Sequence, residues 1–282
     1  MPCHTYRITG DSKRLLAQSL ATIFALWRAP DALAQNSVPQ HAALSDRWLI
    51  SAGVLWSQSD VTANLNAGRI GPGVLIDFED DFGLDEDNFV GTLMFRTHFS
   101  PRWQLEVEYF KLDRANDKHI TRTIEWGDLD IPIDAFARGS FDVEDARVSV
   151  GYAFFKTDDK EVGVGLGAHV TRLEASVSAE RLGSNRAAQT APLPFVTVYV
   201  RMALTDRWLL SARVDRLSLD TGDIDGDVFS SGAEFLYQPW RHFGVGIAYR
   251  DINFQVSSTN SDWRGKAQVH QNGPMLFISS TF

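Results

Sequence analysis

The chain has 282 residues, a formal net charge of −9 at pH 7 and one cysteine, Cys3. An acidic chain is poorly suited to binding nucleic acid, and a single thiol excludes an internal disulfide and a cysteine metal site. After residue 34 no apolar run reaches the roughly 20 residues that a membrane-spanning helix needs. If the protein spans a membrane, it must do so as a closed β-barrel.

The N-terminus has the features of a secretory signal peptide. Arg7, Lys13 and Arg14 form a basic region, and an apolar stretch follows at 15–27. Ala32-Leu33-Ala34 then provides an A-x-A cleavage site.

This pattern divides the chain into three parts. Residues 1–34 are predicted to be a signal peptide that is removed together with Cys3. Residues 35–45 are predicted to be a periplasmic N-terminal lead, and residues 46–282 to be a transmembrane β-barrel.

Residues 46–282 alternate large apolar and small or polar side chains, which is the period of a β-strand. In the first segment Trp48, Ile50, Val54 and Trp56 share one face. The pattern recurs in segments that start near Trp103, Val148, Val162, Val196, Trp208 and Phe243. One face is aliphatic and aromatic, and the other mixes Gly, Ser and Thr with charges. This is typical of a lipid-facing exterior around a narrow, polar lumen.

The links between these segments predict the topology. Short links lie at 100–102, 156–160, 205–207 and 238–240, and long or polar links lie at 60–87, 115–136, 180–191, 219–227 and 256–265. Short periplasmic turns that alternate with long extracellular loops give an antiparallel up-and-down barrel of ten strands. Eight strands is the alternative, if the weakly patterned segment 227–237 is not a strand.

The last segment, residues 274–282, alternates and ends on Phe282. It resembles the C-terminal strand of small outer-membrane β-barrel proteins of Gram-negative bacteria. The resemblance implies that the barrel-assembly machinery recognises this strand through Phe282, and that outer-membrane lipid and lipopolysaccharide are partners.

The acidic segment 76–85, IDFEDDFGLD, resembles a D-L-E-x-D-L-G-L segment of uncharacterised proteobacterial barrel proteins. Phe78 and Phe82 stand where those proteins have Leu. The resemblance implies the barrel class and the outer membrane, but no activity.

Ten charged side chains are predicted to point into the lumen. They are Arg96, Arg147, Arg201, Arg213 and Arg250, with Glu106, Glu108, Asp145, Asp215 and Glu234. Charges in a narrow lumen are unfavourable unless they are paired. We expect a paired network that plugs the barrel, and the alternative is a gated path for small solutes.

Three other motifs have an alternative chemical interpretation. The seven acids between Asp77 and Asp87 are expected to form a solvated loop, and a Ca²⁺ or Mg²⁺ site is the alternative. The glycines at 163, 165 and 167 lie inside a strand, where they make room in the lumen rather than bind a nucleotide. The segment 223–227 is expected to be an acidic turn rather than a calcium loop.

Two enzyme classes use small barrels: proteases resembling omptins, and lipid-modifying barrels. His119, near Asp113 and Asp117, is the histidine placed at the outer rim, whereas His169 faces the lumen. No spacing pairs a nucleophile with a base. We therefore predict no catalytic, cofactor-binding or metal residues, and a non-enzymatic barrel that is structural or binds through its loops. A narrow channel and an outer-membrane enzyme are the alternatives.

Overall fold

The computed structural model describes residues 40–65, 76–126, 129–180, 182–220, 224–259 and 264–282. The predicted signal peptide, its cleavage site and Asp223 lie outside the described residues. In the described part of the chain, no helix is long and apolar enough to cross a membrane.

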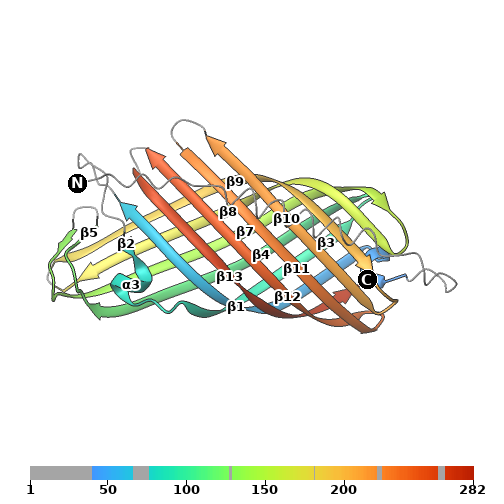
Figure 1. Cartoon of the computed structure of the whole chain (residues 1–282), viewed down its shortest axis with the longest axis horizontal. Helices are drawn as coiled ribbons and strands as arrows, with labels where there is room; N and C mark the ends of the chain where they lie inside the picture. Colours follow the sequence, from blue (N-terminus) through green and yellow to red (C-terminus); the bar gives the residue numbers. More distant parts are fainter. Residues whose placement is uncertain (1–39, 66–75, 127–128, 181, 221–223, 260–263) are drawn as a thin grey trace, which may run out of the picture. The chain divides into compact units, whose positions relative to one another are not determined.

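Ten long antiparallel strands dominate the described residues (Figure 1). They are β1 (Trp48–Leu65), β3 (Asp87–His98), β4 (Trp103–His119), β7 (Phe136–Lys156), β8 (Lys160–Ala179), β9 (Gly183–Ala203), β10 (Trp208–Asp220), β11 (Ile224–Trp240), β12 (Phe243–Thr259) and β13 (Arg264–Thr281). Each long strand pairs with the next one along the chain, and β13 pairs with β1. The sheet is therefore a closed up-and-down barrel, as predicted, with the ten long strands that the turn pattern favoured over eight.

Five short elements lie at the strand ends. α2 (Ala42–Ser45) precedes β1, at the end of the barrel with the short turns. The two-residue β2 (Ile76–Asp77) pairs with β1 and leads into α3 (Phe78–Phe82). β5 (Ile124–Trp126) and β6 (Leu129–Ile131) form a separate hairpin. Figure 1 shows α3, β2 and β5 together at the long-loop end of the strands.

The outer face of the barrel is the apolar face that the alternation predicts. Trp56 is 53% exposed and Leu166 is 68% exposed. Ser57, which follows Trp56 and points to the other face, is fully buried. The pairing of Leu49 with Thr281, and its continuation to Leu65 and Gly265, closes the barrel without reversing the two faces. The ladder along this seam runs through most of both strands, so most of its backbone groups bond within the sheet, as a membrane requires.

Several predicted long loops are in fact strand. β9 begins at Gly183, so only a tight turn separates it from β8, and most of 180–191 is paired. A 21-residue strand at about 3.3 Å per residue and a tilt near 40° is roughly 50 Å tall, against an apolar band of about 25 Å. The strands therefore continue beyond the band with polar outer faces, which is why the sequence pattern ended early.

The predicted turn at 238–240 also lies inside β11, next to a bulge between Tyr237 and Trp240.

The prediction of a wholly polar lumen was wrong for half of the barrel. Toward the short turns the inward side chains are charged, but toward the long loops they are apolar and buried. The barrel interior thus consists of two stacked layers, which together form the candidate site.

Candidate functional site

The charged part of the lumen, here called the charge layer, comes from eight strands. Its members are Arg96, Glu106, Glu108, Asp145, Arg147, Glu161, Arg201, Arg213, Asp215, Glu234 and Arg250. All ten charges that the alternation placed inward do lie there, and Glu161 is an eleventh. Lys156 pairs with Glu161 at 3.0 Å, so that six cations face six carboxylates.

Arg147 lies at the centre of the charge layer and is 2% exposed. Its Nε and Nη2 donate to the two carboxylate oxygens of Asp215 at 2.7 and 3.0 Å. Its Nη1 donates to Glu106 Oε1 at 2.8 Å, and its guanidinium lies 4.8 Å from the centre of the Phe195 ring. This bidentate geometry is the strong form of a charge-assisted hydrogen bond.

The other arginines extend the network across the lumen. Arg201 joins Glu106 and Glu161, each at 2.9 Å. Arg213 binds Glu108 through both of its terminal nitrogens. Arg250 then links Glu108 at 3.1 Å to Glu234 at 2.6 Å. Because Glu106 and Glu108 are each shared between arginines, the buried charges of both signs are paired. Unpaired charges would be strongly unfavourable in the lumen.

Asp145 differs from the other acids because its recorded partners are a histidine and a hydroxyl. His169 Nδ1 lies 2.9 Å from Asp145 Oδ2, and Thr171 Oγ1 donates to Asp145 Oδ1 at 2.6 Å. The imidazole packs against the rings of Phe195 and Phe254, where the charge layer meets the apolar part of the lumen. His169 faces the lumen, as predicted.

α2 lies at the short-turn end of the barrel, beside a hollow of about 570 Å³ that Leu44, His98 and Lys156 help to line. His41 Nδ1 caps α2 by accepting from the Ala43 N–H at 3.1 Å, and both residues are buried. Arg96 Nη2 donates to the Ala43 carbonyl at 3.3 Å, which ties α2 to the charge layer. Burial lowers the pKa of His41 below its ordinary value.

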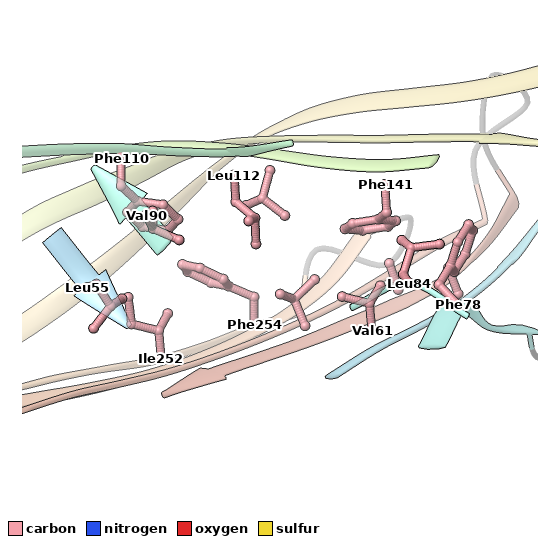
Figure 2. Close-up of a cluster of buried hydrophobic side chains, with 14 of the residues drawn as sticks. Leu55, Val61, Phe78, Leu84, Val90, Phe110, Leu112, Phe141, Ile252 and Phe254 are labelled. Carbon is pink, nitrogen blue, oxygen red and sulfur yellow. The ribbon is translucent and has the colours of Figure 1, made fainter. Parts of the chain in front are cut away.

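Above the charge layer lies a second set of inward side chains, here called the apolar layer. Figure 2 labels several of these side chains, among them Phe110, Leu112 and Phe254, which point toward one another from opposite walls of the barrel. The layer includes Leu55, Val61, Val90, Phe110, Leu112, Phe141, Val143, Phe195, Ile252 and Phe254. The described cavities in the lumen measure about 30 Å³ in the apolar layer, about 50 Å³ at the boundary between the layers and about 20 Å³ in the charge layer. Each holds at most a few water molecules, so the lumen is a packed core.

α3 closes the long-loop end of the apolar layer. Phe78 and Phe82 are fully buried, and the Phe78 ring packs 5.4 Å from Phe141 and 5.8 Å from Trp126, between ring centres. A Cβ built on Gly139 would lie 2.4 Å from Phe82 Cγ, so this glycine makes room for the helix.

Two acids of α3 bind arginines: Arg114 lies in β4, and Arg122 lies in the loop between β4 and β5. Glu79 Oε1 accepts from Arg114 Nη1 at 2.5 Å, and Asp81 pairs with Arg122. Burial raises the pKa of Glu79, and the Arg114 charge opposes that rise. Among the described residues, no three Asp, Glu, His or Cys side chains are placed to hold a metal ion. Glu79 and Asp81 thus attach α3 to neighbouring parts of the chain, so the acidic loop is not purely solvated.

The rim histidine does not form the acid–histidine pair that an enzyme would need there. His119 Nδ1 lies 3.4 Å from the Asp134 carbonyl, and the ring packs on Phe136. Asp117 is paired with Arg138, and Asp113 with Lys111.

The glycine motif behaves as expected, but the acidic turn expected at 223–227 is wrong for the part that the structure describes, where residues 224–227 are paired as strand. The three glycines lie within β8, and a Cβ on Gly163 would come within 2.3 Å of the Tyr199 ring, so the glycine makes room in the lumen. Asp225 and Asp227 lie within β11, and Asp227 pairs with Arg216 at 2.9 Å.

Sequence reasoning missed the apolar layer, Glu161 and the anchors of α3. The first two had a signal in the sequence. Phe110 and Leu112 continue the inward phase of Glu106 and Glu108, and Glu161 continues that of Gly163. The pairing of Glu79 with Arg114 joins a loop to a distant strand, and no local pattern indicates it.

Comparison with known proteins supports the fold class. No protein-family model and no curated protein sequence matches the chain. The structure is similar to the outer-membrane protease OmpT of Escherichia coli, with a TM-score of 0.55 and 9% identity over 84% of this chain and 97% of that one. It also aligns with Ail, the attachment invasion locus protein of Yersinia pestis, with a TM-score of 0.34 and 14% identity over 84% and 99% of the two chains. The chain thus has the fold of Gram-negative outer-membrane β-barrels. At these identities the likeness concerns the fold alone.

Proposed function

We propose that this protein is a closed, non-enzymatic barrel of the bacterial outer membrane that is structural or binds partners through its long-loop end. The observation that carries the proposal is the filled lumen. The charge layer crosses the whole interior with paired charges, and the apolar layer and α3 close the other half. A solute path would need these side chains to separate, at the cost of uncompensated buried charge.

The exterior of the barrel supports the same proposal. Its apolar band suits contact with lipid and lipopolysaccharide, and the polar strand extensions lie beyond that band. Export by the signal peptide at 1–34 and insertion by the barrel-assembly machinery, through the strand that ends at Phe282, belong to the proposal. In this orientation the short turns and α2 face the periplasm, and α3 faces the outside.

Conductance measurements test the proposal. Protein purified from the outer-membrane fraction of cells that express the full chain should insert into planar bilayers and give no steady current, because both halves of the lumen are filled. OmpT-like protease and lipid-modifying activity should be absent from the same preparation. Large, stable currents would support a channel instead, and absence of the protein from that fraction would contradict the location.

A further inference from the structure

Cations and aromatic side chains gather along one arc of the short-turn end of the barrel. They come from three corners: the β3–β4 turn, the place where β13 ends beside the start of β1, and the β11–β12 turn. The corners are neighbours because β12 pairs with β13, β13 with β1, and β1 with β3. We call residues 46–48, 99–103, 240–243 and 280–282 the rim arc, which joins six of the ten long strands.

Hydrogen bonds hold the rim arc together. Trp48 and Phe282 exchange two backbone hydrogen bonds, of 2.9 and 3.0 Å, where β1 starts beside the end of β13. His242 Nδ1 of the β11–β12 turn lies 2.7 Å from the Thr281 carbonyl. The exposed side chains of these corners therefore belong to one continuous surface.

The rim arc carries a dense set of exposed aromatic side chains. They are Trp48, Phe99, Trp103, Trp240, Phe243 and Phe282. The apolar band continues from them toward the long loops, with Ile50 and Ile278 about half exposed. Tryptophan is enriched where hydrocarbon meets the lipid head groups, because its ring is apolar and its N–H is polar. The rim arc therefore lies at the head-group level of the leaflet on the short-turn side.

Three arginines of the rim arc each adjoin one of these tryptophans in the sequence. Arg47, Arg102 and Arg241 are all exposed, and the Arg47 guanidinium lies 5.6 Å from the centre of the Trp48 ring. Within the described residues none of the three has an ion pair, in contrast to the arginines of the charge layer. Their charges are thus available to groups outside the protein.

Few acids offset these three cations. Within the rim arc the negative groups are Asp46, whose Oδ2 atom is buried, and the terminal carboxylate of Phe282. The other short turns differ, because they contain Asp158, Asp159 and Asp206 beside their cations. The rim arc is therefore a positive segment of an otherwise acidic chain.

We propose that the rim arc binds the phosphate groups of anionic glycerophospholipids in the leaflet on the short-turn side, through Arg47, Arg102 and Arg241. The inference rests on the proposed function, because it needs the barrel to lie in the membrane. A guanidinium matches a phosphate in charge and in the geometry of its donors. The adjoining aromatic rings suit the boundary between the glycerol groups and the acyl chains. The excess of positive charge favours a lipid with a net negative charge over a zwitterionic one.

Spin-labelled lipids test the proposal. Protein purified from the outer-membrane fraction is reconstituted into phosphatidylcholine vesicles that contain a trace of spin-labelled phosphatidylglycerol or phosphatidylcholine. Electron paramagnetic resonance measures the fraction of label that the barrel immobilises. We expect phosphatidylglycerol to be preferred several-fold at low ionic strength, and the preference to fall as salt is added. The net charge of −9 on the whole chain would by itself disfavour an anionic lipid, so such a preference must have a local cause.

Two triple variants of the rim arc test the role of the cations. Arg47→Gln, Arg102→Gln and Arg241→Gln together should remove the preference for phosphatidylglycerol. Replacement of the same three arginines by Lys should keep the preference, because the charges remain. The lysine variant also separates the loss of charge from a fault in folding.

A charge-matched variant at the long-loop end is the control. Arg138→Gln, Arg172→Gln and Arg186→Gln together change the net charge equally, but each of these arginines is already paired with an acid, so the preference should persist. Equal loss in the two glutamine variants, or no preference in the unmodified protein, would overturn the proposal. Neither outcome depends on whether the barrel conducts ions, so a failure here is distinct from a failure of the proposed closed barrel.

Discussion

At the scale of single residues, the charge layer depends on carboxylates that several arginines share. Glu106 accepts hydrogen bonds from Arg147, Arg201 and Arg213, and Asp215 accepts two from Arg147. Removal of one arginine therefore affects more than one carboxylate. Buried ion pairs are not strongly stabilising against apolar replacements, but a broken pair is strongly destabilising.

Arg147→Ala should destabilise the barrel by about 3–5 kcal/mol, because it leaves Asp215 and Glu106 short of compensation in the lumen. Urea unfolding of the refolded protein in lipid vesicles measures the change. Arg138→Ala is the matched control. Arg138 pairs with Asp117 on the surface at 3.0 Å, so its loss should change stability by less than about 1 kcal/mol. Equal effects of the two variants would show that the charge layer is not a compensated network.

At the scale of elements, α3 and α2 lie at opposite ends of the barrel and are attached in different ways. α3 inserts aromatic side chains and is attached by arginine pairs, and its C-cap is Gly83 in the left-handed region at φ 67°. α2 is only four residues long and is held by one hydrogen bond from the Arg96 side chain to the Ala43 carbonyl and by the buried His41. We therefore expect α3 to be displaced by substitutions that disturb its packing, and α2 to be released at low pH.

Gly139→Ala should displace α3, because the added Cβ would overlap the Phe82 ring. Such overpacking reduces stability by about 1–3 kcal/mol. Limited proteolysis of the protein in vesicles should then cleave the segment around α3 faster. Gly91→Ala is the control, since a Cβ there would meet nothing within 4 Å. Unchanged cleavage of Gly139→Ala would show that α3 does not depend on this contact.

The docking of α2 should weaken in acid. The folded pKa of His41 lies below its ordinary value because of burial, so the undocked state binds the proton more readily. Docking is therefore unaffected above the ordinary pKa of about 6.5 and weakens as the pH falls below it. The hydrogen-exchange rate of the α2 amides, corrected for intrinsic rates, should therefore increase as the pH is lowered from about 7.5 to about 5. His41→Asn keeps a capping side chain but should lose this pH dependence; a persistent dependence would implicate another group.

At the scale of the whole barrel, two layers of different chemistry fill one lumen. The charge layer lies at the level of the short turns, and the apolar layer lies toward the long loops beneath α3. Together they make the interior a core rather than a pore.

The sequence alone determined the barrel class, the division into outward and inward faces and the ten inward charges. These follow from a period of two, because each strand residue must face either lipid or lumen. Only the tertiary structure showed which charges meet, since Arg147 and Asp215 lie 68 residues apart. It also decided where strands ended beyond the membrane, because there the outer face becomes polar while the inner face becomes apolar. The position of α3 depends on contacts between distant segments, and no local pattern encodes such contacts.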